Sequence, residues 1–268
     1  MRGRRLGVAQ VMKAVLLAGG LGTRMREETE YRPKPMVEVG GKPVLWHIMK
    51  ILSTHGINDF VICAGYKAEM IANYFANYSI MNSDFTVKLG DHTLTPHQST
   101  HDEDDWTVTV VNTGLNTMTG GRIKRIQKYI GDEPFFCTYG DGIADVDITK
   151  LIEFHKSHNR LGTMTTTRPF SRFGVVDFAG DGTVAQFREK PQGDDWVNIG
   201  YFIFEPEVFD YIEGDSTVLE RAPLHNLATD KQLTAFKHDG FWQPMDTQRE
   251  YQMLNEIWDG GAPWKKWE

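Results

Sequence analysis

The first half of the chain alternates short buried-strand patterns with helical patterns, and this alternation constrains the fold more than any other feature. Continuous apolar runs predict strands at Lys13–Ala18, 60–64 and 134–139. Between them, apolar residues recur at the spacing of helices, as at residues 44–52 and 70–78. Strands that are joined through helices form parallel sheets with helices on both faces. The pattern therefore predicts an α/β fold built on a mixed, mostly parallel sheet.

The second half of the chain has a different pattern, in which short strands follow one another through short links. Gly180-Asp181-Gly182 predicts a hairpin turn between two of these strands. No internal repeat is evident, so residues 12–268 are expected to form a single domain with a smaller β-rich part. The remaining expected elements are strands at 85–89, 106–111, 163–167, 173–178, 183–188, 199–204 and 233–238, and helices at 123–130, 148–158 and 247–258.

The composition excludes several classes of protein. Of the 268 residues, 40% are hydrophobic and 24% are charged, as in ordinary globular proteins. The net charge of −7 argues against a partner made of nucleic acid, and no apolar stretch is long enough to span a membrane. The two cysteines, Cys63 and Cys137, lie in apolar strand patterns and are expected to be buried and unpaired, which fits a reducing, cytoplasmic location.

The N-terminus superficially matches a signal peptide, because three arginines precede an apolar run. Lys13 interrupts that run, and the apolar stretch after it is too short for a signal peptide. We therefore expect residues 1–11 to be a dispensable leader and the domain to start near Met12.

One long polar stretch, residues 91–105, is expected to be a solvated loop or insertion. It contains His92, His97 and His101 among several carboxylates, so a metal site is the alternative. The spacing of these residues matches no common ligand pattern, which favours the loop.

The loop that follows the first strand, AGGLGTR at residues 18–24, is the feature that most clearly indicates chemistry. Glycines at this place expose backbone amides that can surround a phosphate. No P-loop string is present, and Met25 stands where a dinucleotide-binding fingerprint needs a glycine, which weakens a dehydrogenase interpretation. Arg24 closes the loop, and Lys34 follows between two prolines that fix its backbone. Two such cations beside a glycine loop suit a triphosphate.

GGLGTR followed by PKPM resembles the signature of the sugar-1-phosphate nucleotidyltransferases, and the resemblance extends over almost the whole chain from Met12. The strings KPMVEVGGKPVLWHIMK, TMTGGRIKR, TYGDG, FWQPMDT and APWKKWE resemble the glucose-1-phosphate cytidylyltransferase branch of that family. The resemblance implies a Rossmann-like nucleotidyltransferase fold. Within it, residues 12–160 would mainly bind the nucleotide, and residues 161–268 would mainly bind the sugar phosphate and supply the C-terminal helix.

The reaction implied by the resemblance joins CTP and α-D-glucose 1-phosphate to give CDP-glucose and pyrophosphate. The sugar phosphate attacks the α-phosphorus directly with the help of Mg²⁺, and its ionised phosphate needs no general base. In the family this product feeds the deoxysugars of surface polysaccharides such as the lipopolysaccharide O-antigen. The alternatives are the same chemistry with another nucleotide, such as dTTP, or another sugar 1-phosphate, and a non-catalytic regulatory homologue that binds sugar nucleotides.

The resemblance also implies roles for individual residues. Arg24 and Lys34 would be catalytic, and Asp141 and Asp246 would bind the metal ion. The sugar phosphate would be bound by Gly174, Glu189, Lys190 and Asn198. The nucleotide would be bound by Leu17, Ala18, Gly19, Gly20, Gly22, Thr23, Arg24, Lys34, Thr117, Arg122 and Gly140.

Several of these residues also have a purely structural interpretation. Asp141 fits a turn, and Asp246 fits the N-cap of the last helix. The TMTGGR string, which holds Thr117 and Arg122, fits a helix start with a solvated arginine, and Glu189-Lys190 fits an exposed strand end.

Three further features bear on the sugar site and on assembly. Ile199 replaces a glycine of the family pattern and is expected to add bulk beside the sugar, while Leu219 and Ala222 replace a tryptophan and a glutamate. The C-terminal Trp258, Trp264 and Trp267 indicate burial against some other part or partner, and the family that the chain resembles tends to oligomerise. A homo-oligomer is therefore expected.

Overall fold

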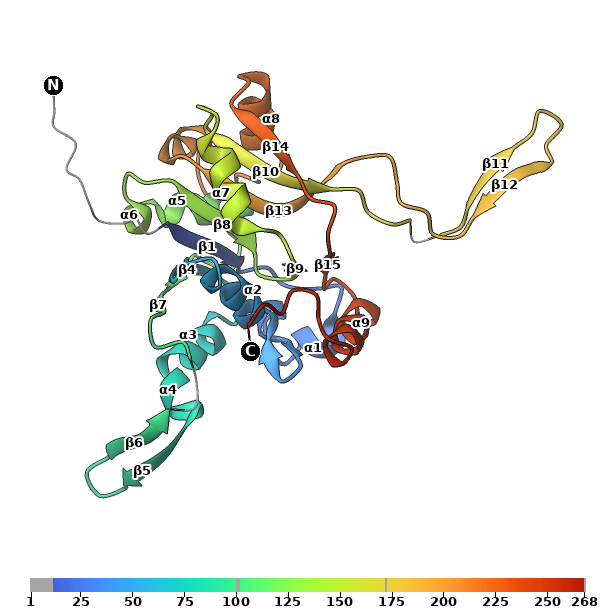
Figure 1. Ribbon diagram of the computed structural model, residues 1–268. Helices are drawn as coiled ribbons and strands as arrows, with labels where there is room; N and C mark the ends of the chain where they lie inside the picture. Colours follow the sequence, from blue (N-terminus) through green and yellow to red (C-terminus); the bar gives the residue numbers. More distant parts are fainter. Residues whose placement is uncertain (1–11, 100–101, 172, 268) are drawn as a thin grey trace, which may run out of the picture.

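The computed structural model describes residues 12–99, 102–171 and 173–267 (Figure 1). Within them, seven strands form one sheet in the order β14-β10-β13-β8-β1-β4-β7. β13 runs antiparallel to both of its neighbours and the other pairs are parallel, which confirms the mixed, mostly parallel sheet. The strands are β1 (Lys13–Ala18), β4 (Asp59–Ala64), β7 (Thr107–Asn112), β8 (Phe135–Tyr139), β10 (Gly162–Thr167), β13 (Val197–Phe204) and β14 (Leu233–Lys237).

The sheet separates two apolar clusters, because successive side chains of a strand point to opposite faces. Leu16 of β1 lies in one cluster, and its neighbours Val15 and Leu17 lie in the other. The helices follow the same division, so both faces are covered. The first cluster includes residues of α2 (Val44–Ser53), α3 (Ala68–Ala76), α7 (Ile148–Lys156) and α9 (Gln248–Asp259), and the second includes residues of α5 (Thr119–Arg125), α6 (Gln127–Ile130) and α8 (Ala222–Thr229).

Several short elements fall outside the sequence prediction because they span too few residues to show a period. Among them, β15 (Trp242–Pro244) pairs antiparallel with β9 (Gly142–Ala144) and brings the segment before α9 next to the end of β8. The others are α1 (Arg26–Thr29), the 3₁₀ turns η1 (Lys34–Met36) and η2 (Pro206–Tyr211), β2 (Glu38–Val39), β3 (Lys42–Pro43) and α4 (Tyr78–Met81).

The solvated loop or insertion expected at residues 91–105 is in part a strand, because β6 (Thr93–Ser99) pairs antiparallel with β5 (Ser83–Lys88) in an exposed hairpin outside the main sheet. Leu94 lies opposite Val87, so one face of this hairpin is apolar although the sequence is mostly polar. His101 lies outside the described residues, and the described part of the chain contains no cluster of three side chains that could hold a metal ion there.

A second hairpin, formed by β11 (Val175–Phe178) and β12 (Val184–Arg188), projects from the body as a long arm (Figure 1). The predicted turn at Gly180-Asp181-Gly182 is confirmed, and Gly182 adopts a positive φ of 85° there. One face of the arm is apolar and exposed, and the opposite face carries the ion pair between Asp177 and Arg188 at 2.6 Å. The apolar face consists of the opposed pairs Val176–Phe187 and Phe178–Val184.

The C-terminal tryptophans pack inside their own chain. Trp264 is 0% exposed and stacks on Phe241 at 5.3 Å between ring centroids. Its ring also lies edge-on to His47, and burial lowers the pKa of His47 to about 4. Trp258 lies 4.9 Å from the same imidazole. The burial expected for the tail is therefore confirmed, and it takes place within the chain, so the tail itself gives no evidence for a partner surface.

Two other expectations concern burial and membranes. Cys63 and Cys137 are both free and buried as expected, and burial raises the pKa of the Cys63 thiol to about 12. Among the described residues, no helix is both long enough and apolar enough to cross a bilayer.

Replacing Trp264 with alanine is expected to lower the free energy of unfolding by about 3–5 kcal/mol, because it opens a cavity under the tail. Urea unfolding followed by far-ultraviolet circular dichroism measures this. The matched control is Trp196→Ala, at a tryptophan that is 36% exposed, and a smaller loss is expected there. Equal losses in the two variants would show that Trp264 does not anchor the tail.

Candidate active site

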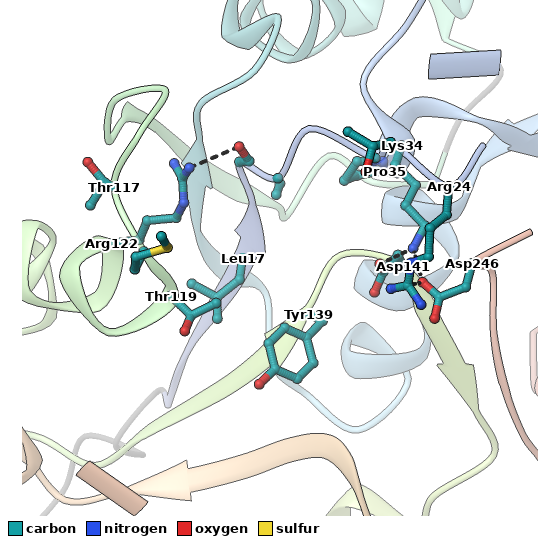
Figure 2. A pocket seen from close by; sticks show the side chains of 16 residues that line it. Leu17, Arg24, Lys34, Pro35, Thr117, Thr119, Arg122, Tyr139, Asp141 and Asp246 are labelled. Carbon is teal, nitrogen blue, oxygen red and sulfur yellow. Dashed lines mark hydrogen bonds and ion pairs between the residues drawn. The ribbon is translucent and has the colours of Figure 1, made fainter. Parts of the chain in front are cut away.

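A pocket of about 320 Å³ opens where the carboxyl ends of the parallel strands meet, which is the usual ligand position in such sheets (Figure 2). The glycine loop that follows β1 forms one wall and the start of α5 another, and the rest comes from η1 and from the residues that follow β8 and β15. The lining residues are Leu17, Ala18, Gly19, Gly20, Gly22, Thr23, Arg24, Lys34, Pro35, Thr117, Met118, Thr119, Arg122, Tyr139, Asp141 and Asp246.

The structure brings together almost every residue that was predicted for the nucleotide, the metal ion and catalysis. Gly140 lies just behind the wall, where its backbone N–H donates to the carbonyl of Leu17 at 3.0 Å. The sequence missed Pro35, Met118, Thr119 and Tyr139 as lining residues, although each lies within two positions of a predicted residue. Their side chains carry no motif of their own, so only the fold shows that they reach the pocket.

Arg122 links the glycine loop after β1 to the segment after β7, which lies two strands away in the sheet (Figure 2). Its guanidinium donates to the carbonyl of Gly19 after β1, at 2.9 Å, and to Thr113 Oγ1 and the Gly114 carbonyl after β7, at 2.7 and 2.8 Å. A Cβ at Gly19 would collide with this guanidinium, which explains the glycine. The side chain is thus held by neutral acceptors, and burial lowers its pKa. The interpretation of Arg122 as a solvated surface residue is wrong.

The glycine pair before Arg122 has a steric reason. A Cβ at Gly121 would lie 2.6 Å from the Asp215 backbone, and one at Gly120 would lie 2.8 Å from the Thr217 carbonyl. The segment around Asp215 also supplies the carbonyl that accepts from Met118 N, and Arg125 pairs with its carboxylate at 2.5 Å. The start of α5 is therefore fixed by a segment from the second half of the chain.

Lys34 lies between the two acidic residues that were predicted as metal ligands (Figure 2). Its Nζ is 2.5 Å from Asp141 Oδ2 and 2.5 Å from Asp246 Oδ1. The guanidinium of Arg24 lies 3.0 Å from the same oxygen of Asp246. The Lys34 side chain is only 10% exposed, whereas that of Arg24 is 72% exposed. Two carboxylates are thus neutralised by two cations at the mouth of the pocket.

Backbone contacts position both carboxylates. Asp141 follows β8, and its carbonyl accepts from Met245 N at 2.9 Å, which places Asp246 beside it. Asp246 N donates to Glu250 Oε2 at 2.8 Å, while Thr247 accepts from Glu250 N at 3.3 Å. The N-cap of α9 is therefore Thr247, and the interpretation of Asp246 as that cap is wrong. Its carboxylate faces the pocket instead, and two carboxylates suit the oxygen preference of Mg²⁺.

A histidine–aspartate pair braces the strand pair that carries these ligands. His238 Nε2 lies 3.2 Å from Asp145 Oδ1, and the same oxygen accepts from Phe241 N at 2.7 Å. Burial would lower the pKa of His238, but the hydrogen bond that its Nε2–H donates to Asp145 raises it. The pKa of Asp145 is lowered by its bond to His238, although burial opposes this shift.

The residues predicted for the sugar phosphate lie elsewhere. Gly174, Glu189 and Lys190 lie at the base of the β11–β12 arm, and Glu189 and Lys190 are more than half exposed. Asn198 lies on β13 and accepts from Gly200 N at 2.8 Å. Neither the arm residues nor Asn198 is among the described residues that line the pocket. Ile199 packs into the main core at 4% exposure and does not line this pocket.

The fold and the pocket define a nucleotide-transferring enzyme class, and comparison with known proteins gives the family. The nucleotidyl transferase family model matches residues 13–248, and the chain belongs to this family. It is 52% identical over 260 residues to a glucose-1-phosphate cytidylyltransferase of Salmonella typhimurium, covering 96% of this chain and 100% of that protein. It is 41% identical to a probable glucose-1-phosphate cytidylyltransferase of Bacillus subtilis, over 96% and 100% of the two chains.

Solved structures show the same fold at lower identity. HddC from Yersinia pseudotuberculosis matches with a TM-score of 0.67 and 24% identity, over 92% of this chain and 99% of that one. A UDP-glucose pyrophosphorylase in complex with UDP-glucose matches with a TM-score of 0.66 and 16% identity, over 94% and 99%.

His238→Gln is expected to lower the free energy of unfolding more at pH 6 than at pH 8.5. A group whose pKa is raised by folding stabilises the protein below its unfolded pKa, near 6.5, and this contribution is lost as the pH rises through the raised value. Urea unfolding of the wild type and the variant across this pH range measures the difference. A difference that does not change with pH, or that grows with pH, would contradict the pairing with Asp145.

Proposed function

We propose that this protein transfers the cytidylyl group of CTP to α-D-glucose 1-phosphate, releasing pyrophosphate and forming CDP-glucose. The observation that carries the proposal is the pocket itself, in which a glycine loop and two cations stand beside a carboxylate pair. The identity to cytidylyltransferases over 96% of the chain supports the choice of substrates. A cytoplasmic location is part of the proposal, supported by the two free, buried cysteines.

In the proposed reaction, an oxygen of the sugar phosphate attacks the α-phosphorus of CTP and the bond to the pyrophosphate oxygen breaks. The attacking phosphate is already ionised at neutral pH, so the chain's task is to position two anions and balance their charge. The backbone N–H groups around Gly19 and Gly20 face the nucleotide, and Lys34 and Arg24 bind the triphosphate oxygens. Arg122 keeps the loop in place and adds a positive charge to the pocket wall.

We further propose that Asp141 and Asp246 hold a Mg²⁺ ion. When bound, the ion supplies positive charge to the phosphate oxygens and orients them for displacement. The two residues fit this ion, because one oxygen of each carboxylate lies 2.5 Å from the same point, the Lys34 Nζ. Backbone hydrogen bonds also hold both residues in place.

The first test is pyrophosphate release by the purified protein with Mg²⁺ and glucose 1-phosphate, with CTP, dTTP, UTP, ATP and GTP offered separately. Release with CTP alone, and none without the sugar phosphate, is expected. Cytosine offers an amino donor where thymine and uracil offer a carbonyl, and a site that pairs with one leaves a buried group unpaired with the other.

The other outcomes of this panel separate the alternatives. Release with dTTP or UTP at an equal rate would contradict the specificity for CTP but keep the transferase chemistry. No release with any nucleotide, over a panel of sugar 1-phosphates, would favour the regulatory homologue.

The second part of the proposal concerns the sugar phosphate and the homo-oligomer. The cations that line the pocket among the described residues are Arg24, Lys34 and Arg122, and each is assigned to the triphosphate or the loop. Lys190 and Glu189, which the resemblance assigns to the sugar phosphate, are carried outward on the arm. We propose that a second copy of the chain brings these two residues to the pocket.

The arm itself supports a second copy as its partner. An isolated two-stranded hairpin is marginally stable in water, and this one leaves an apolar face uncovered. Phe178 is 71% exposed and Phe187 is 61% exposed on that face. A surface of this kind is expected to be buried between copies, which would also carry Lys190 to a neighbouring pocket.

Mixing two inactive variants tests this arrangement. Asp246→Asn removes a pocket carboxylate and Lys190→Met removes the arm cation, so each variant alone is expected to be inactive. Co-expressed in equal amounts, they are expected to recover about a quarter of the wild-type activity, because random assembly pairs an intact pocket with an intact arm at that frequency. The control is co-expression of Asp246→Asn with Lys34→Met, both in the pocket, which must stay inactive. No recovery in the first mixture would show that the arm serves its own chain.

A further inference from the structure

The feature that carries a further inference is the position of the Lys34 ammonium. It lies 2.5 Å from one oxygen of Asp141 and 2.5 Å from one oxygen of Asp246. These two carboxylates are also the proposed ligands of the divalent ion, so the ammonium occupies the position where that ion would bind. Two centres of positive charge cannot share that position, because like charges a few ångströms apart repel strongly at low dielectric.

We propose that Lys34 serves as the resident counter-ion of the carboxylate pair, so that the metal ion binds effectively only when a triphosphate draws the ammonium away. The inference rests on the proposed metal assignment and deepens it. Lys34 then has two positions, one on the carboxylates without ligand and one on the phosphate oxygens with ligand.

The backbone of Lys34 is held in place, so only its side chain can move between the two positions. The residue begins the 3₁₀ turn η1, directly after Pro33 and before Pro35, so its backbone is held on both sides. The ring of Pro35 also packs closely against Gly140, since a Cβ added to Gly140 would lie 3.2 Å from that ring. The backbone cannot withdraw, but the flexible stem of a lysine can redirect its ammonium within the pocket that it lines.

Charge balance makes metal and nucleotide depend on each other. A divalent ion that arrives alone must displace Lys34 and leave a nearly buried ammonium without an anionic partner, which is unfavourable. A triphosphate offers new acceptors to the same ammonium and frees both carboxylates for the ion. Arg24 cannot replace Lys34 in this role, because it contacts only Asp246 and is largely exposed. The coupling is reciprocal, so the ion also strengthens nucleotide binding.

Mn²⁺ binding without nucleotide, measured from the free-ion signal in electron paramagnetic resonance, tests the inference. The wild type is expected to bind Mn²⁺ weakly, and Lys34→Met is expected to bind it at least about tenfold more tightly, because the competing charge is gone. The matched control is Lys150→Met, which removes a lysine from an exposed ion pair with Asp147 outside the pocket. This control is expected to bind Mn²⁺ like the wild type.

A double variant separates this inference from the metal assignment. Lys34→Met with Asp246→Asn is expected to lose the tight Mn²⁺ site of Lys34→Met. If it kept that site, the ion would bind elsewhere and the metal assignment would be wrong. If the wild type bound Mn²⁺ as tightly as Lys34→Met, the metal assignment would stand and the role of Lys34 as counter-ion would be overturned. Lys34→Gln repeats the measurement if the methionine variant does not give the wild-type circular dichroism spectrum.

Discussion

The burial of β1 in the middle of the sheet is the constraint on which the pocket depends. β1 pairs in parallel with β4 on one side and β8 on the other, and β4 pairs in parallel with β7. All four strands therefore end at the same edge, and the segments that follow them must meet there. The two apolar clusters fix β1 in this position, because its side chains enter both. The packing of an apolar strand thus determines where the polar chemistry is assembled.

Charge at that edge is arranged in two distinct ways. Arg122 is surrounded by carbonyl and hydroxyl oxygens, so it keeps its positive charge available while it fixes the backbone. Lys34 is instead paired with carboxylates, and its charge becomes available to a ligand only if the pair separates. One cation is therefore a fixed part of the wall, and the other is suited to move. This division matches a reaction that must first hold one anion and then bring a second to it.

The projecting hairpins and the C-terminal tail show how apolar surface is distributed outside the core. The apolar surface of the tail is buried within the chain, because Trp264 packs against His47 and Phe241. The β11–β12 arm does not, because a two-stranded ribbon has only one neighbour for each strand and no helix over its apolar face. A count of aromatic residues could not separate the two cases, since both segments are rich in them. The structural support for a homo-oligomer therefore comes from the arm and not from the tail.

The sequence by itself determined most of the long elements, though not α8 (Ala222–Thr229), and most of the pocket. The strand at Lys13–Ala18 and the sheet class follow from apolar periodicity, and the glycine loop with Arg24 and Lys34 is a motif at the end of that strand. Asp141 and Asp246 follow from the resemblance to the nucleotidyltransferase family. Short elements such as β15 carry too few residues for a period, and β6 is polar enough to resemble a loop.

Only the tertiary structure decided which side chains face each other across large sequence separations. Lys34 contacts Asp246 from the opposite end of the chain, Thr247 takes the capping role that Asp246 also fitted, and Ile199 turns into the core. These outcomes depend on strand order and on side-chain direction, which the local pattern of residues does not encode.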